Sequence, residues 1–134
     1  MEIKNAFMTN TTILAFMGDA IYESFVRGHV ISSGQTKSEK LHKEAVKFVR
    51  ADAQAKAIGK MFDDLTLEEQ NLVKRARNKK ITSKPKNVDP IEYKLATAFE
   101  ALIGGLYLSG DQIRLDELLN KAIKLIQEEN STNK

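Results

Sequence analysis

LAFMGDAIYESF (Leu14–Phe25) and KLATAFEALIGGLYL (Lys94–Leu108) are the two most apolar stretches of the chain, and they decide its fold. In both, apolar residues recur at steps of three and four, which is the period of a helix that packs against a core. The chain contains no run of alternating β-branched residues between glycine-rich turns, which would indicate strands. Working outward from these two stretches, we expect an all-α fold.

Each stretch also contains an isolated acid, Asp19 in the first and Glu100 in the second. A buried carboxylate is costly unless it is paired, hydrogen-bonded, neutralised or bound to a cation. No Lys or Arg lies within one helical turn in a register that pairs with either acid. Gly18 precedes Asp19, and Gly104 and Gly105 lie one turn after Glu100. Because a helical glycine costs up to about 1 kcal/mol relative to alanine, we interpret these glycines as points of close helix approach.

If the two helices cross at the glycines, Asp19 and Glu100 face each other across a narrow cleft. Such a cleft suits Mg²⁺, which binds a few carboxylates and keeps several waters. Glu23, one turn after Asp19, could extend the acidic lining. The alternative is purely structural, because amphipathic helices often carry an acid on their polar side and glycines often serve packing alone. The spacing by itself favours this structural alternative.

The remaining helices are predicted from periodicity, caps and breakers. The helix that contains Asp19 is expected to have Thr11 or Thr12 as its N-cap and to end near Ser33. Its recurring apolar side comprises Ile13, Phe16, Met17, Ala20, Ile21, Ser24 and Phe25. Further helices are predicted over Lys37–Lys60 with Ser38 as cap, from Thr66 onward, over Ile91–Leu108 and over Asp111–Glu128. Residues 1–134 are expected to form a single domain with a frayed tail at 130–134.

The chain has 134 residues, with 21 basic and 18 acidic side chains, a net charge of +3 and no cysteine. The missing cysteines exclude disulfide, thiolate-metal, iron–sulfur and cysteine-nucleophile chemistry. Seven cations and no acid lie between Leu72 and Val88, which favours docking of a polyanion. A solvated face is the ordinary alternative for such a run. No apolar run reaches the ~20 residues of a membrane span, so we expect no membrane partner and a cytoplasmic location.

Three segments carry a family resemblance: LAFMGDAIYESFVRGH (Leu14–His29), KRARNKKITSKPKNVDPIEYKLAT (Lys74–Thr97) and AFEALIGGLYLSG (Ala98–Gly110). A fourth segment, LHKEAVKFVRADAQAKA (Leu41–Ala57), looks like a second helix of the same family. In this order they resemble the ribonuclease III endonuclease domain, and especially its short form. The resemblance spans nearly the whole chain. It implies a homodimeric helical bundle with endonuclease activity on double-stranded RNA.

The resemblance also implies roles for single residues. Asp19 falls on the metal-binding aspartate of the family's signature helix and Glu100 on a second catalytic acid, with Mg²⁺ as the cofactor. Ala15 and Thr97 stand where larger members have further acids, a departure that the short form shares, so the number of Mg²⁺ ions stays open. The helix that contains Asp19 is expected near the two-fold interface of the dimer.

No double-stranded-RNA-binding domain follows in the sequence, so we expect phosphate contacts from the catalytic domain or from a partner. The candidate RNA-binding residues are Lys74, Arg75, Arg77, Asn78, Lys79, Lys80, Lys84 and Lys86, with Arg50, Gln54 and Lys56 as weaker candidates. Resemblance to the short form further implies maturation of the large-subunit (23S) ribosomal RNA precursor. It also points to a large-subunit ribosomal protein as a partner.

Two other functions stay open at this point. A non-catalytic helical module that binds RNA or dimerises is favoured by the missing acids at Ala15 and Thr97, whereas retention of Asp19 and Glu100 argues against it. A zinc hydrolase is a weaker third hypothesis, because the two histidines, His29 and His42, form no His-Glu-x-x-His arrangement.

Overall fold

The computed structural model describes residues 2–81 and 85–132, and every regular element in that part of the chain is a helix. The all-α prediction is therefore confirmed. The elements follow one another in the order η1 (Ala6–Met8), α1 (Thr11–Ser32), α2 (Ser38–Val49), α3 (Ala51–Met61), η2 (Phe62–Asp64), α4 (Leu67–Arg77), α5 (Pro90–Ser109) and α6 (Gln112–Thr132). None of the helices in this part of the chain has the length and apolar character needed to span a membrane.

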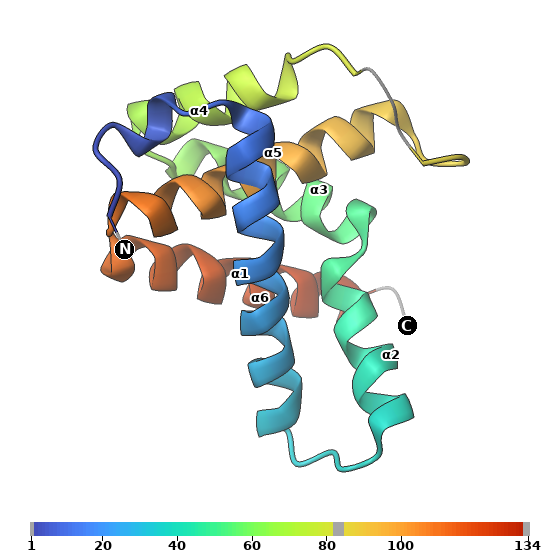
Figure 1. Ribbon diagram of the computed structural model, residues 1–134. Coiled ribbons are helices and arrows are strands. Elements are labelled where there is room, and N and C mark those ends of the chain that lie inside the picture. Colours follow the sequence, from blue (N-terminus) through green and yellow to red (C-terminus); the bar gives the residue numbers. More distant parts are fainter. Residues whose placement is uncertain (1, 82–84, 133–134) are drawn as a thin grey trace.

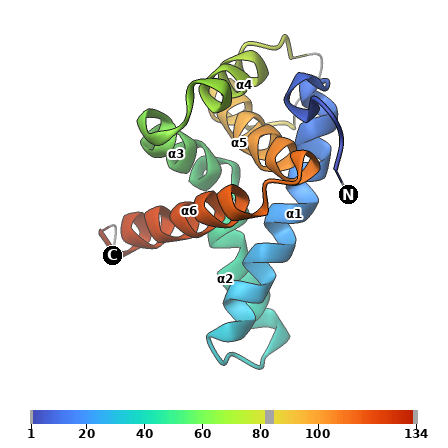
Figure 2. The same ribbon diagram turned by 90° about the vertical axis from the view of Figure 1, so that its left-hand side faces the viewer.

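Helix α5 is the centre of the bundle, and half of its 20 residues are buried. It packs against α1, α3 and α4, with α1 as its most extensive neighbour. Figure 1 shows α1 crossing in front of α5, while α1 and α2 together project as a hairpin beyond the other helices. In the turned view of Figure 2, α6 runs across the direction of this hairpin, and its Gln127 reaches His29 of α1. The two apolar stretches of the sequence thus meet at the crossing of α1 and α5.

Two glycines bring the backbones of α1 and α5 into contact. A Cβ atom added to Gly18 would lie 1.7 Å from the carbonyl oxygen of Glu100, and one added to Gly104 would lie 1.9 Å from the carbonyl oxygen of Leu14. No side chain fits in either place. The predicted crossing at these glycines is confirmed. Gly105 has a different neighbourhood, because its added Cβ would meet the side chains of Leu72 and Phe7 instead.

The single helix predicted over Lys37–Lys60 was wrong. The chain breaks at Arg50, whose φ of −58° and ψ of 147° are extended, and two helices, α2 and α3, flank the break. Arg50 lies within a run of residues that all tolerate helix, with no glycine or proline, so the sequence carries no local signal for the break. Tertiary packing of α2 along α1 and of α3 along α5 accompanies the change of direction.

Helix ends agree with the prediction at some positions and correct it at others. Thr66 caps α4 through a capping box with Glu69, and Gly110 ends α5 with a positive φ of 81°. At the start of α1, however, Asn10 is the cap in place of Thr11 or Thr12, because its side chain accepts from the backbone N–H of Thr12. Likewise Ser38 is the first residue of α2 and not its cap.

The end of the chain is also more regular than predicted. Helix α6 continues through Thr132, so residues 130–132 of the expected frayed tail are helical. Residues 133 and 134 lie outside the described part of the chain.

The buried face of α1 differs from the predicted apolar side. Leu14, Tyr22 and Val26 are essentially inaccessible to solvent, whereas Ile13 and Phe16 are 55% and 81% exposed. Helix α1 is apolar around most of its circumference, so hydrophobic periodicity alone does not select one face. The contact at Gly18 selects the face toward α5 and leaves an apolar face uncovered in the single chain.

Candidate active site

Asp19 and Glu100 lie on opposite sides of the helix crossing, as the sequence predicts. Asp19 is exposed on α1 directly after Gly18, and Glu100 is half-buried on α5 one turn before Gly104. The two carboxyl groups are close enough to share a hydrogen bond. Because both helices are in backbone contact at the neighbouring glycines, the separation of the two acids is set by this close packing.

Burial raises the pKa of the Glu100 carboxyl to about 8. A hydrogen bond with Asp19 and the negative charge of Asp19 contribute to this increase, the nearby amide of Gln54 opposes it, and the charge of Glu23 makes the smallest contribution. Near neutral pH, Glu100 therefore holds a proton that it would lose if a cation lay beside it. A strongly perturbed acid in a groove is typical of a functional site.

A groove of about 470 Å³ opens over the two acids. Its wall is completed by residues from the start of α1, the end of α4 and the segment that follows, and the first half of α5. The lining residues are Thr12, Ala15, Phe16, Asp19, Ala76, Lys79, Lys80, Ile81, Tyr93, Lys94, Thr97 and Glu100. Two carboxylates and three lysines thus share one groove, so it can bind a cation and a phosphate group together.

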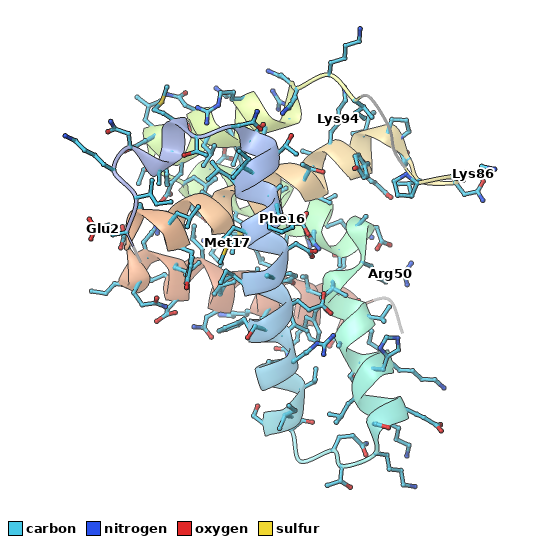
Figure 3. The ribbon with its side chains drawn as sticks, viewed as in Figure 1. Glu2, Phe16, Met17, Arg50, Lys86 and Lys94 are labelled. Carbon is cyan, nitrogen blue, oxygen red and sulfur yellow. The ribbon has the colours of Figure 1, made fainter. Side chains whose placement is uncertain are left out.

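Lys94 is a member of this groove that the sequence did not single out as functional. It lies on α5, close to the junction with the preceding loop, and its side chain is partly buried (Figure 3). The sequence shows only that Lys94 is six residues from Glu100, too far along a helix to pair with it. Its membership in the groove depends on how α5 packs beneath α1.

The basic segment Lys74–Lys86 divides into residues that reach the groove and residues that do not. Lys79 and Lys80 line it, and the ammonium group of Lys79 lies 3.1 Å from Asn10 Oδ1 and 2.5 Å from Thr12 Oγ1. These bonds hold the start of the segment against the N-terminus of α1. Lys80 and Lys94 have no ion pair within the described residues.

Arg75 serves the fold of the N-terminal segment. Its guanidinium donates to the carbonyl oxygens of Phe7 and Thr9, the latter at 3.2 Å. Lys74 lies over the ring of Phe62 at 5.8 Å from its centroid, and Arg77 donates to Asn78 Oδ1 at 3.3 Å.

The far end of the basic segment lies apart from the groove. Lys86 stands at the outer end of the loop between α4 and α5, away from α1 (Figure 3), and does not line the groove. Lys84 lies outside the described residues.

The weaker RNA-binding candidates lie on α2 and α3. Arg50 is exposed and pairs with Asp52 at 3.1 Å, and Lys56 pairs with Glu129 at 3.6 Å. Gln54 corrects the prediction, because only 4% of it is exposed and its side chain faces Glu100 in the interior. A residue at that depth has no surface to offer RNA.

Glu23 and the two histidines take other partners. Glu23 forms an ion pair with Arg27 at 3.3 Å. Its negative charge makes a small contribution to the raised pKa of Glu100, but Glu23 does not line the groove. His29 Nε2 lies 3.0 Å from the side-chain nitrogen of Gln127, and its ring meets Phe48 edge-on at 5.3 Å between centroids. His42 is exposed on α2. Neither histidine lines the groove of Asp19 and Glu100.

Comparison with known proteins shows the family to which the chain belongs. Residues 12–111 match the model of the ribonuclease III domain, so the chain belongs to the ribonuclease III family and is an endoribonuclease. Its relatives include the Mini-ribonuclease 3 of Brevibacillus brevis, 48% identical over 122 residues that cover 91% of each chain. The Mini-ribonuclease 3 of Symbiobacterium thermophilum is 41% identical over 127 residues, 95% of this chain and 98% of that relative.

A solved structure supports the fold. The crystal structure of a protein from Fusobacterium nucleatum superposes with a TM-score of 0.79 at 34% identity, covering 87% of this chain and 93% of the other. Because the curated relatives are named as ribonucleases, the hypothesis of a non-catalytic module is not supported.

Proposed function

We propose that this endoribonuclease hydrolyses phosphodiesters of double-stranded RNA with Mg²⁺ held by Asp19 and Glu100. The observation that carries the proposal is the groove itself, which brings these two carboxylates together with Lys79, Lys80 and Lys94. Carboxylates without a bound cation would repel a phosphodiester. With a divalent cation between them, the same groove becomes attractive to one.

The donor set fits Mg²⁺. Within the described residues, no group of three or more His, Asp or Glu side chains could hold a metal ion by itself. Asp19 and Glu100 would be the protein ligands because both line the same groove, with water in the remaining positions, as Mg²⁺ prefers. The cation would replace the proton that Glu100 otherwise holds. When bound, Mg²⁺ supplies an acidified water and a counter-charge for the phosphate.

The lysines of the groove supply the substrate contacts. Lys80 and Lys94 would contact phosphates of the strand to be cut, and Lys79 would keep the basic segment beside α1. An A-form duplex presents phosphates and 2′-hydroxyl groups across a shallow minor groove, so cations without an aromatic platform suit it. Positioning of the phosphate over the two acids is the protein's main contribution to the rate.

A homodimer would complete the site. Ile13 and Phe16 form an exposed apolar face on α1, and Phe16 also lines the groove. A second copy packed on this face would cover these residues and would lie next to the groove. Two grooves related by the two-fold axis could then each cut one strand of a duplex.

The substrate we propose is the large-subunit ribosomal RNA precursor, met in the cytoplasm, with a large-subunit ribosomal protein as a partner. The similarity to Mini-ribonuclease 3 proteins supports the choice of an RNA substrate.

The test is a cleavage assay on a long RNA duplex and on its separated strands, with and without Mg²⁺. We expect cutting of the duplex alone, only with Mg²⁺, and staggered ends when both strands are mapped. Equal cutting of single strands, or cutting in excess chelator, would contradict the proposal.

A further inference from the structure

Gln54 is a polar side chain in the interior of the bundle. It lies on α3, four residues after the break at Arg50, and 4% of it is exposed. Its amide nitrogen Nε2 donates to the carbonyl oxygen of Val49 at 2.9 Å, across the break. Its amide oxygen Oε1 is buried and has no hydrogen-bond partner within the described part of the chain.

The bond to Val49 fixes which way the amide points. A carbonyl oxygen only accepts, so the nitrogen of the Gln54 amide must face Val49. The same NH₂ group has a second N–H, and the amide lies close enough to the Glu100 carboxyl to lower the pKa of that carboxyl. Because α3 packs along α5, the amide is held between the end of α2 and the acid of the groove.

The bond to Val49 accounts for the amide nitrogen at this position but not for the buried amide oxygen. A buried acceptor without a partner costs about 1–3 kcal/mol, which an apolar side chain of similar size would avoid. The bond to the Val49 carbonyl, worth about 1 kcal/mol net, does not clearly offset this cost. The contact with Glu100 is the remaining reason for an amide here.

We propose that Gln54 is a positioning residue for the metal site, holding one oxygen of the Glu100 carboxylate by its N–H so that the other faces Asp19 and the groove. This inference rests on the proposed function, because it assigns a role toward the Mg²⁺ held by Asp19 and Glu100. Gln54 itself does not line the groove and touches neither substrate nor the reacting atoms. Partners of this kind orient a metal-binding carboxylate.

Gln70 offers a matched control. Its Nε2 donates to the carbonyl oxygen of Phe62 at 2.9 Å, the same kind of bond to a backbone carbonyl, with no part in the groove. Replacing either glutamine with methionine removes one such bond and keeps the side-chain length. Only Gln54→Met also removes the partner of Glu100.

The experiment titrates wild type, Gln54→Met and Gln70→Met with MgCl₂ in the absence of RNA, followed by calorimetry, and then measures the Mg²⁺ dependence of duplex cleavage. We expect Gln54→Met to bind Mg²⁺ about 10–100-fold more weakly than wild type, as for lost partners of metal ligands, while Gln70→Met is unchanged. Gln54→Met should melt at or above the temperature of Gln70→Met, and high Mg²⁺ should restore part of its activity.

Two results would overturn the inference and leave the proposed function standing. One is unchanged Mg²⁺ binding by a folded Gln54→Met. The other is a Gln54→Met that loses its fold where Gln70→Met keeps it, since Gln54 would then serve the structure. If wild type binds no Mg²⁺, the metal role of Asp19 and Glu100 fails, and this inference fails with it.

Discussion

The crossing of α1 and α5 and the basic segment Lys74–Lys86 meet at the same groove, but they are held there in opposite ways. At the crossing, backbone lies against backbone at Gly18 and Gly104. The described residues of the basic segment are mostly exposed, and polar contacts such as those of Lys79 hold them. The positions of Asp19 and Glu100 are therefore fixed by backbone packing that leaves no room for a larger side chain at the glycines. The position of the basic segment depends on hydrogen bonds that are individually weak.

The sharpest way to break this comparison is to add one methyl group at the crossing. The Cβ of Gly18→Ala would overlap the carbonyl oxygen of Glu100, so the helices must separate. We expect a loss of more than about 4 kcal/mol of unfolding free energy, measured in urea, which is a large part of a small domain's stability. Gly59→Ala on α3 is the control, since its added Cβ meets nothing within 4 Å, and it should gain up to about 1 kcal/mol. Equal stability of the two variants would mean that the crossing is not tight.

The next effect concerns the proton on Glu100. The pKa of this carboxyl is raised to about 8. Below pH 8, Mg²⁺ must therefore displace a proton from Glu100 in order to bind, whereas above pH 8 the carboxyl is already ionised. The affinity for Mg²⁺ should rise about tenfold per pH unit toward pH 8 and then level off. Calorimetry on the RNA-free protein measures this directly. An affinity that is flat between pH 6 and 8 would show that Glu100 is already ionised or does not bind the metal.

Without metal, the same proton makes the fold depend on pH. The unfolded chain releases the Glu100 proton near the ordinary pKa of 4.5, and the folded chain holds it to about pH 8. Unfolding thus releases a proton between these values, so the contribution of Glu100 to stability falls as pH rises and is fully lost above pH 8. Glu100→Gln should therefore stabilise the metal-free protein by about 1–3 kcal/mol at pH 9 and much less at pH 4. Urea unfolding at both pH values tests this, and an equal effect at both would contradict it.

The smallest effects are expected in the basic segment, and they should separate its members. Lys80→Ala and Lys94→Ala should each weaken duplex binding about tenfold or less and lower the salt slope by nearly one, because each removes one phosphate contact. Arg75→Gln should leave the slope unchanged and lower stability by about 1–2 kcal/mol, since Arg75 bonds to the Phe7 and Thr9 carbonyls. Filter binding at several salt concentrations distinguishes them. If Arg75→Gln alone lowered the salt slope, Arg75 would be the phosphate contact and Lys80 and Lys94 would not.

The sequence predicts the crossing because its signals are local. Acids and glycines in apolar, helix-periodic stretches report burial and close approach before any contact is known. By contrast, three features depend on residues distant in sequence. They are the break at Arg50, the position of Lys94 in the groove and the burial of Gln54. The run of cations predicts a positive field, but the bonds that Lys79 donates to Asn10 and Thr12 are what show which part of the run lies beside the acids.

The face of α1 that is buried shows the same limit. Apolar residues surround most of this helix, so their period does not tell which side meets α5. Gly18 carries that information, but only once Gly104 is known to lie opposite it.

The central claim is that Asp19 and Glu100 together hold the cation that cuts duplex RNA. The most direct measurement is the rate of Mg²⁺-dependent duplex cleavage by Asp19→Asn beside wild type, with helix content and dimerisation of both measured in parallel. Asp19 is exposed, so the variant should keep its fold and its association while losing cleavage by at least about a hundredfold, as expected when a metal ligand is removed. A folded Asp19→Asn that cuts the duplex at the wild-type rate would contradict the account.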